Sequence, residues 1–180
     1  MNIFSNQLKT DLKDNILLKL FYKMNFIRLV EYKLADEKKK GKIIGPVHLC
    51  VGQEAIPVGI SQNLNKKNIQ IFGNHRSHGH LLSLDTNLTF FFSEILGKNN
   101  GLSGGMGGSM HLIDKKNGFF GSVPIVGATV PIAVGSALAS KMNSQNKISI
   151  AYFGDSALEE GAVQESLNFA NNVLKKGKRY

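Results

Sequence analysis

The sequence predicts an α/β fold with a mainly parallel sheet flanked by helices, and two observations lead to this class. A strand-like run at 147–153 ends in a Gly-Asp turn and is followed by a helix with an apolar face. Helical stretches precede this unit, and such alternation is typical of a parallel sheet covered by helices. The 180 residues, 42% of them hydrophobic, suffice for one domain with its own core.

The N-terminal part of the chain predicts one long amphipathic helix. A charged run at 36–42 ends it, with Gly41 as a stop signal. We assign 1–42 to an N-terminal helical segment and 43–180 to a single α/β domain. The apolar stripe continues to about Leu34 and recurs at steps of three or four through Leu8, Leu12, Ile16, Leu20, Met24 and Ile27.

The remaining elements are shorter and surround a long loop. Such a loop inside a compact domain is usually functional or disordered. Gly135 and Ala139 share one helix face and would let another element pack closely. The last helix has its apolar face at Val163, Leu167, Ala170 and Leu174. The other predicted elements are a helix at 53–64, a strand at 69–72, a helix at 88–96, a Gly-rich loop at 97–124 and a helix at 127–141.

Composition restricts the partners and the location. The net charge is +9, but the lysines are scattered and no nucleic-acid-binding motif occurs, so a solvated surface is favoured over a nucleic-acid partner. The basic field would favour anionic substrates or an acidic subunit. The single cysteine, Cys50, is expected to be a small buried residue. No apolar stretch matches a membrane span and no secretory signal is evident, so we expect no membrane partner and a cytoplasmic location.

The most informative single residue is Asp155, in the Gly-Asp turn where the strand at 147–153 ends. Ligands of parallel sheets bind at the carboxyl ends of strands. A carboxylate there can bind Mg²⁺, which prefers hard oxygen ligands and keeps phosphate oxygens in its shell. An Asp that caps a helix gives the same local pattern, and Gly-Asp alone favours the cap.

Three further stretches contain side chains suited to catalysis or anion binding. His48 precedes a predicted helix, and a His/Arg cluster at 75–80 follows a predicted strand. Arginine suits phosphate oxygens, and histidine can transfer protons near neutral pH. The histidine spacing matches no standard zinc site. The Gly-rich stretch 101–111 has neither a P-loop ending nor a dinucleotide-binding pattern. Structural histidines and a flexible surface loop are the alternatives for each stretch alone.

Taken in order, these stretches closely resemble the α subunit of thiamine-diphosphate-dependent 2-oxo acid dehydrogenases, the E1 family of pyruvate, branched-chain 2-oxo acid and acetoin dehydrogenases. The resemblance runs from about residue 20 to about residue 170. It is carried by HLCVGQEA at 48–55, NHRSHGH at 74–80, GGSMH at 107–111, IVGATVP at 125–131 and FGDSA at 153–157.

The resemblance implies thiamine diphosphate and Mg²⁺ as cofactors and assigns a role to each motif. Asp155 would ligate Mg²⁺. The catalytic residues would be His48, which contacts the 2-oxo acid, and His78. The cofactor would be bound by His75 and Arg76, by Pro124, Ile125 and Val126 around the thiamine, and by Asp155, Ser156 and Ala157 at the diphosphate.

The same resemblance implies partners and a reaction. An E1 β subunit would complete an α2β2 heterotetramer and supply the glutamate that activates the cofactor. A 2-oxo acid, pyruvate first, would be decarboxylated, and the acyl group would pass to a lipoyl-bearing E2.

Two departures from the family pattern stand out. Ser156 occupies a position where glycine is usual, which would strain the backbone if φ had to be positive there. The Asn-Asn pair that completes the metal site would fall beyond Tyr180, and Asn171-Asn172 is expected on an exposed helix surface. We therefore expect the N-terminal part of an E1 α subunit, whether truncated, frameshifted or a fragment. The alternative is an inactive remnant that at most docks on a partner.

Overall fold

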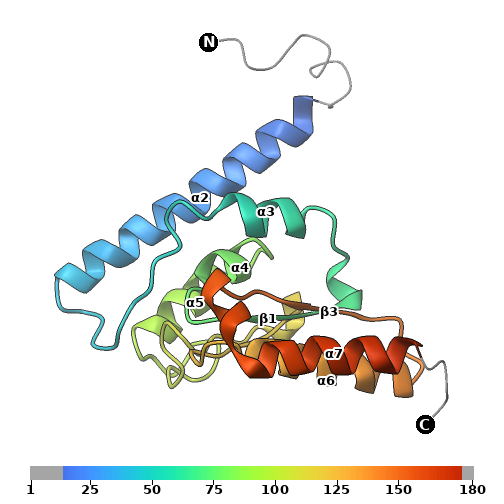
Figure 1. The fold of residues 1–180 in the computed structure, drawn as a ribbon. Helices are drawn as coiled ribbons and strands as arrows, with labels where there is room; N and C mark the ends of the chain where they lie inside the picture. Colours follow the sequence, from blue (N-terminus) through green and yellow to red (C-terminus); the bar gives the residue numbers. More distant parts are fainter. Residues whose placement is uncertain (1–13, 176–180) are drawn as a thin grey trace.

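A computed structural model describes residues 14–175, with side chains described from 16 to 172. Leu8, Leu12 and the tail at 176–180 lie outside the described residues. Three parallel strands form one sheet in the order β2-β1-β3, and helices cover it on both sides (Figure 1). The predicted α/β class with a parallel sheet is confirmed.

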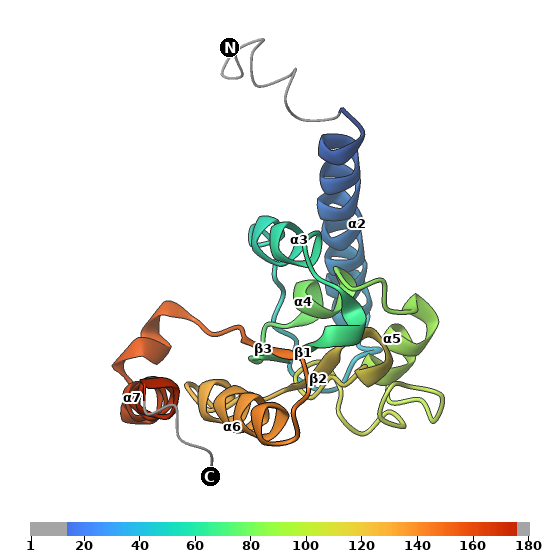
Figure 2. The ribbon, with the colours of Figure 1, turned by 90° about the vertical axis from the view of Figure 1, so that its right-hand side faces the viewer.

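The long helix α2 (Asp14–Lys39) lies across one side of the molecule (Figures 1 and 2). Its apolar stripe faces inward, and Ile27 and Leu34 are fully buried. The helix continues five residues beyond the predicted end at Leu34. Glu37 supports this last turn through ion pairs with Lys33, Lys40 and Lys42. Gly41 has φ +73° and follows the helix as predicted.

The central strand β1 (Ile69–Gly73) pairs with β2 (Phe119–Ser122) on one side and β3 (Ile148–Ala151) on the other. Ile71 lies opposite Phe119 in one pair and Ile150 in the other. Because β1 is flanked on both edges, four of its five residues are buried. The sheet core continues into α4 (His78–Leu82) and α5 (Leu88–Ile95), where Phe91 is fully buried.

The prediction of one loop over 97–124 is wrong in its last part. This segment contains a short helical turn η2 (Lys115–Asn117) and the strand β2. The strand has only four residues, one of them glycine, so its own pattern gives little strand signal. Pairing with β1, far away in the sequence, stabilises it as a strand. The helix α4 escaped prediction because five residues are too few for a periodic pattern.

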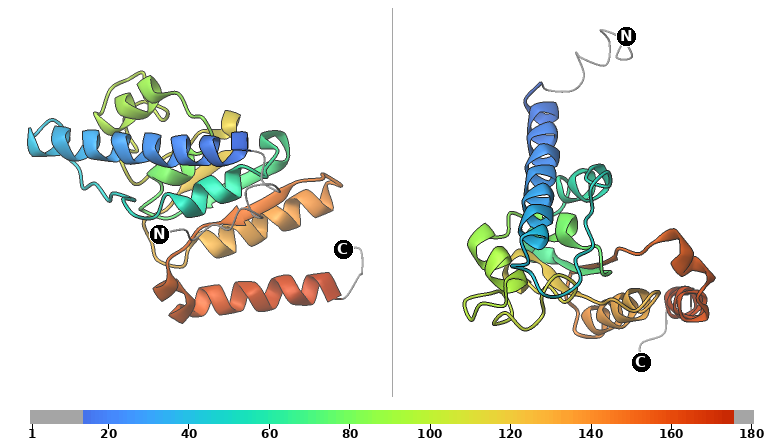
Figure 3. Two further views of the ribbon diagram at one scale, coloured as in Figure 1. Left: turned by 90° about the horizontal axis from the view of Figure 1, so that it is seen from above. Right: turned by 90° about the vertical axis from the view of Figure 1, so that its left-hand side faces the viewer.

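The other helices match their predictions to within a few residues. They are α3 (Ala55–Ser61), α6 (Thr129–Met142) and α7 (Gly161–Lys175), with a short helical turn η1 (Lys66–Asn68) before β1. The helix α6 packs on the sheet and α7 lies beside α6, away from the strands (Figures 2 and 3).

The small-residue face predicted for α6 and the apolar face predicted for α7 are largely open within the described chain. Gly135 is exposed, and a Cβ atom at this position would meet nothing within 4 Å, so no element packs closely on it; Ala139 is exposed as well. In α7 Val163 is buried, but Leu167 is 49% exposed. The side chain of Leu174 lies outside the described side chains. Both helices therefore leave apolar or small residues on an open face.

Candidate functional site

A cleft of about 540 Å³ opens at the carboxyl ends of β1 and β3, where ligands of parallel sheets bind. The segment after β1 contributes one wall and the segment after β3 contributes the other. The loop before α6 and the start of α3 close the ends. The lining residues are Gln53, Ile56, Asn74, His75, Arg76, His80, Val126, Gly127, Thr129, Tyr152, Phe153, Gly154, Asp155, Ser156 and Ala157.

Most of the residues predicted from the sequence to bind a cofactor share this cleft. They are His75, Arg76, Val126, Asp155, Ser156 and Ala157. Pro124 and Ile125 come immediately before Val126 but are not among the lining residues, and Ile125 is 68% exposed. The cleft thus brings together segments that are about 50 and 30 residues apart in the sequence.

Asp155 begins the short helical turn η3 (Asp155–Glu159), directly after the extended Gly154. The residue that caps this turn is Gly154, and the Asp155 side chain makes no hydrogen bond to any described residue. The carboxylate is exposed to the cleft. The helix-cap alternative therefore does not describe Asp155, and its oxygens can accept a ligand.

Ser156 fits its position without backbone strain. Among residues 14–175 the non-glycine residues with positive φ are Asp85 and Ser144, so Ser156 has an ordinary φ. Ser156 needs none of the conformational freedom of glycine. A glycine of the cleft that does need this freedom is Gly127, which has φ +80° and where an added Cβ atom would lie 3.0 Å from Glu160 Cβ.

Arg76 lines the cleft and is held by two contacts. Its backbone N–H donates to Asn74 Oδ1 at 2.8 Å, and its guanidinium donates to the carbonyl of Leu49. The second contact joins the 48–55 element to the segment after β1. Arg76 is half-buried, so its charge is fixed in place while the guanidinium still faces the cleft.

His48 packs against the cleft residue His75, with ring centroids 4.9 Å apart in an edge-to-face arrangement. Burial, followed by the nearby His48 and Arg76, lowers the pKa of His75 below its ordinary value. His48 itself is half-buried and stands behind His75 outside the lining. The two residues form an imidazole pair at the edge of the cleft.

His80 is a cleft residue that the sequence interpretation did not select. Its ring stacks on Tyr152 with centroids 3.9 Å apart and an interplanar angle of 8°. Burial, followed by the nearby His78, lowers the pKa of His80 to about 3, and burial raises the pKa of Tyr152 to about 12. Both rings are therefore neutral at physiological pH and give the cleft a flat, uncharged wall. The only sequence signal was membership of the 75–80 cluster.

His78 does not reach the cleft. It is fully buried, with Nδ1 at 2.7 Å from Glu31 Oε1 and Nε2 at 2.7 Å from Ser109 Oγ. The other Glu31 oxygen accepts the backbone N–H of Cys50 at 2.7 Å. His78 thus joins α2, the 48–55 element and the Gly-rich loop. Its buried position suits a residue that holds these segments together, and not the catalytic residue expected from the sequence.

The Gly-rich loop is built around the buried carboxylate of Glu94 in α5. Its backbone N–H groups donate to both oxygens, from Ser103 at 2.6 Å and Gly105 at 3.0 Å, and from Gly107 at 2.7 Å and Gly108 at 3.3 Å. The alternative of a flexible surface loop is therefore wrong. The loop borders a separate cavity of about 280 Å³ and contributes no residue to the cleft.

Comparison with known proteins assigns the family. The model of the family described as dehydrogenase E1 component matches residues 22–175. The chain belongs to this family. The α subunit of the pyruvate dehydrogenase E1 component of Rhizobium meliloti is 40% identical over 153 residues, which are 85% of this chain and 44% of the relative. The corresponding subunit of Rickettsia prowazekii is 38% identical over 154 residues, 86% of this chain and 47% of the relative.

A third relative is the α subunit of acetoin:2,6-dichlorophenolindophenol oxidoreductase of Cupriavidus necator. It is 40% identical over 154 residues, 86% of this chain and 46% of the relative. The similar proteins are thus E1 α subunits of pyruvate and acetoin dehydrogenases. This E1 chain spans less than half the length of the curated relatives it matches.

The described part of the E1 chain contains neither a membrane-spanning helix nor a cluster of metal-ligating side chains. Between residues 14 and 175 no helix is long and apolar enough to cross a membrane. In the same part, no three His, Cys, Asp or Glu side chains converge in a way that could hold a metal ion. Asp155 is therefore a single carboxylate in the cleft.

Proposed function

We propose that the cleft binds the diphosphate of thiamine diphosphate together with Mg²⁺, as part of a 2-oxo acid dehydrogenase E1 reaction. The observation that supports this most is that Arg76 and Asp155 line one cleft at the strand ends. A guanidinium suits phosphate oxygens, and a carboxylate suits the magnesium that accompanies them. Family membership makes this pairing a specific expectation.

Each lining residue would contribute in a way that follows from its chemistry. Arg76, fixed by Leu49, would neutralise diphosphate charge without a change of conformation. Asp155 would supply one oxygen ligand to Mg²⁺. Val126, half exposed, offers apolar surface to a ring. The stacked His80 and Tyr152 are neutral and would exclude water without competing for the anion.

The substrate, partners and location are part of the same proposal. Thiamine diphosphate supplies the carbanion chemistry that decarboxylates a 2-oxo acid, and pyruvate is our first candidate. The imidazole pair His48 and His75 would orient the substrate carboxylate at the edge of the cleft. An E1 β subunit would complete an α2β2 heterotetramer, a lipoyl-bearing E2 would take the acyl group, and the location would be cytoplasmic.

One observation supports a second candidate, an inactive chain that at most docks on an intact partner. Among the described residues Asp155 has no companion side chain that could complete a metal site. A site with one protein oxygen would hold Mg²⁺ weakly unless the rest comes from outside the described residues. The two candidates make different predictions for binding once an E1 β subunit is present.

Titration calorimetry of the 180-residue chain with thiamine diphosphate and Mg²⁺ separates these possibilities. Alone, the chain should bind more weakly than micromolar, and this weak binding should need Mg²⁺. Asp155→Asn should remove the affinity that Mg²⁺ adds, and Arg76→Gln should weaken binding at every Mg²⁺ concentration. Glu159→Gln, in the same turn but outside the lining, is the matched control.

Addition of an E1 β subunit provides the decisive comparison. The proposed function predicts tighter cofactor binding and CO₂ release from pyruvate in the mixture. No binding at millimolar cofactor, either alone or with the β subunit, would reject the cleft as a thiamine diphosphate site. Binding without CO₂ release from any 2-oxo acid would favour the inactive chain.

A further inference from the structure

A second pocket, separate from the cleft, lies between α2, α3 and the turn that follows α4. Its volume is about 530 Å³, within the range of about 300–1,000 Å³ that small-molecule sites occupy. The lining includes the apolar side chains of Leu18 and Leu20 of α2 and Val58 of α3. It also includes three lysines and one aspartate: Lys19, Lys23, Lys66 and Asp85.

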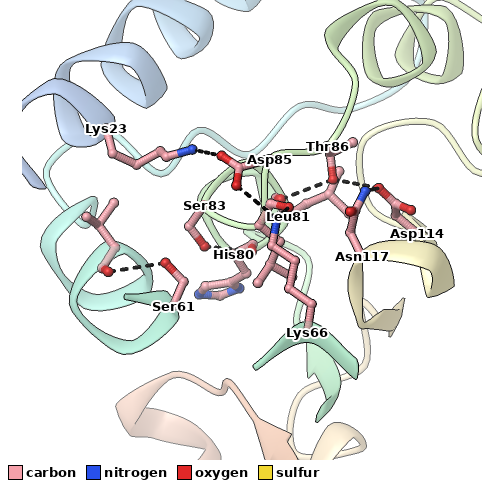
Figure 4. Close-up of polar contacts among 12 residues, drawn as sticks. Lys23, Ser61, Lys66, His80, Leu81, Ser83, Asp85, Thr86, Asp114 and Asn117 are labelled. Atoms are coloured by element: carbon pink, nitrogen blue, oxygen red, sulfur yellow. Dashed lines mark hydrogen bonds and ion pairs between the residues drawn. The ribbon is translucent and has the colours of Figure 1, made fainter. Parts of the chain in front are cut away.

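Two of these lysines are held in place by Asp85. Lys23 Nζ contacts one carboxylate oxygen, and Lys66 Nζ lies 2.8 Å from the other (Figure 4). Lys66 Nζ also donates to the carbonyl of Leu84 at 2.6 Å. Both ammonium groups are therefore positioned before any ligand arrives, and no side-chain ordering is needed to bring them together.

The backbone supports the same arrangement. Asp85 has φ +61°, an uncommon conformation for a residue other than glycine. This left-handed turn projects the carboxylate between the two lysines. The Asp85 side chain is 63% exposed, whereas those of Lys23 and Lys66 are 24% and 38% exposed. The lysines thus lie deeper than the carboxylate that organises them.

The charges in the lining do not balance. Lys19, Lys23 and Lys66 carry three positive charges and Asp85 carries one negative charge, which leaves an excess of two positive charges in the lining. A compact ammonium is a binder of carboxylate and phosphate groups. The pocket therefore combines excess positive charge with apolar side chains, and these two features together define a class of ligand.

We infer that this pocket binds a small organic anion, a carboxylate or phosphate monoester with an apolar tail. The acid group would contact Lys23 and Lys66, and the tail would lie against Leu18, Leu20 and Val58. This inference is independent of the proposed thiamine diphosphate site, because the two pockets share no lining residue.

The pocket is nevertheless close to the cleft in the fold. Ser83 lines the pocket, and its hydroxyl donates to the carbonyl of His80 at 2.9 Å (Figure 4). His80 lines the cleft. The backbone N–H of Leu81, which shares a peptide bond with the His80 carbonyl, is therefore a useful probe, because an occupied pocket should change its NMR chemical shift along with those of Ser83 and Asp85.

Four probes test the ligand class in calorimetric titrations of the full chain at low salt: acetate, hexanoate, inorganic phosphate and hexyl phosphate. Hexanoate should bind more tightly than acetate, and hexyl phosphate more tightly than inorganic phosphate, by about tenfold for every two methylene groups buried. Comparison of hexanoate with hexyl phosphate then identifies the preferred acid group. Equal affinities for long and short anions would overturn the inference, since the apolar side chains would contribute nothing.

Paired substitutions on one helix locate the site. Leu18 and Leu29 of α2 are 66% and 68% exposed, but only Leu18 lines the pocket. Leu18→Asp and Leu29→Asp change the net charge of α2 equally, so a difference between them reports on position. Leu18→Asp should weaken hexyl phosphate binding at least tenfold, whereas Leu29→Asp should leave the affinity within about twofold. Equal losses in the two variants would refute the location. The double variant Lys23→Gln/Lys66→Gln should abolish saturable binding and its salt dependence, and undiminished binding would also refute it.

Discussion

The carboxylate of Glu94 is expected to be one of the largest single contributions to the stability of this chain. It is fully buried and satisfies the backbone N–H groups of Ser103, Gly105, Gly107 and Gly108. Glu94→Gln keeps the shape of the side chain but turns one acceptor oxygen into a donor. Two backbone N–H groups would then face an NH₂ group.

The magnitude follows from the bonds that the substitution removes. Each hydrogen bond to a charged acceptor contributes about 1.5–3 kcal/mol, and a buried N–H left without a partner costs a similar amount. Loss of two such bonds, partly relieved by outward movement of the loop, should destabilise the chain by about 3 kcal/mol. Against a typical total of about 5–15 kcal/mol, this is a large fraction.

Urea unfolding followed by circular dichroism measures this change. With a slope of about 2 kcal/mol per molar urea, the midpoint should fall by about 1.5 M. Glu165→Gln is the control, because Glu165 lies exposed on α7. The free energy of unfolding of this variant should stay within about 0.5 kcal/mol of that of the parent chain. Hydrogen exchange should accelerate at the loop amides in Glu94→Gln alone. Equal midpoints for the two variants, with the loop amides still protected, would show that the carboxylate does not hold the loop.

Three other perturbations test separate parts of the structure. Gly127→Ala should lower the free energy of unfolding, measured in urea, by about 1–3 kcal/mol, because φ is +80° and the new Cβ would lie 3.0 Å from Glu160 Cβ. Gly45→Ala is the control and should be nearly neutral, because a Cβ atom there would meet open space. His80 has a pKa of about 3 in the folded chain against 6.5 in the unfolded one, so the unfolded chain takes up the proton first and stability should fall as pH drops from 6.5 towards 3. His80→Phe should reduce the slope of the free energy of unfolding against pH by up to about 1.4 kcal/mol per pH unit. Parallel stability profiles for the variant and the parent would contradict the lowered pKa of His80. Cys50 is 3% exposed, and burial raises its thiol pKa to about 12, so a thiol reagent at pH 8 should modify it only after urea unfolding; rapid reaction of the folded chain would be the contrary result.

Much of the site could be predicted because its residues follow local patterns. Asp155 comes directly after a strand and a glycine, and Arg76 comes just after β1. The carboxyl ends of neighbouring parallel strands meet at one edge of the sheet, so these positions were bound to converge. Tyr152, directly after β3, and Gln53, shortly before α3, also line the cleft, but their residue types carry no comparable signal for a ligand site.

The two histidines at 78 and 80 show the limit of such reasoning. Both lie in the same motif, and the family resemblance implied a catalytic role for His78 and none for His80. In the fold His78 is buried between Glu31 and Ser109, while His80 faces the cleft beside Tyr152. Glu31, Ser109 and Tyr152 are 31 or more residues away from these rings in the sequence, so no local pattern distinguishes the two rings.

The sequence by itself determined the α/β class, the order of most helices and strands and the family motifs, because these depend on side-chain periodicity and spacing within short segments. Only the tertiary structure decided that Phe119–Ser122 is a strand, that Glu94 organises the Gly-rich loop, and that Lys23 and Lys66 meet at Asp85. Each of these depends on contacts between distant segments, and such contacts form only when the chain has folded and a buried polar group has found its partner.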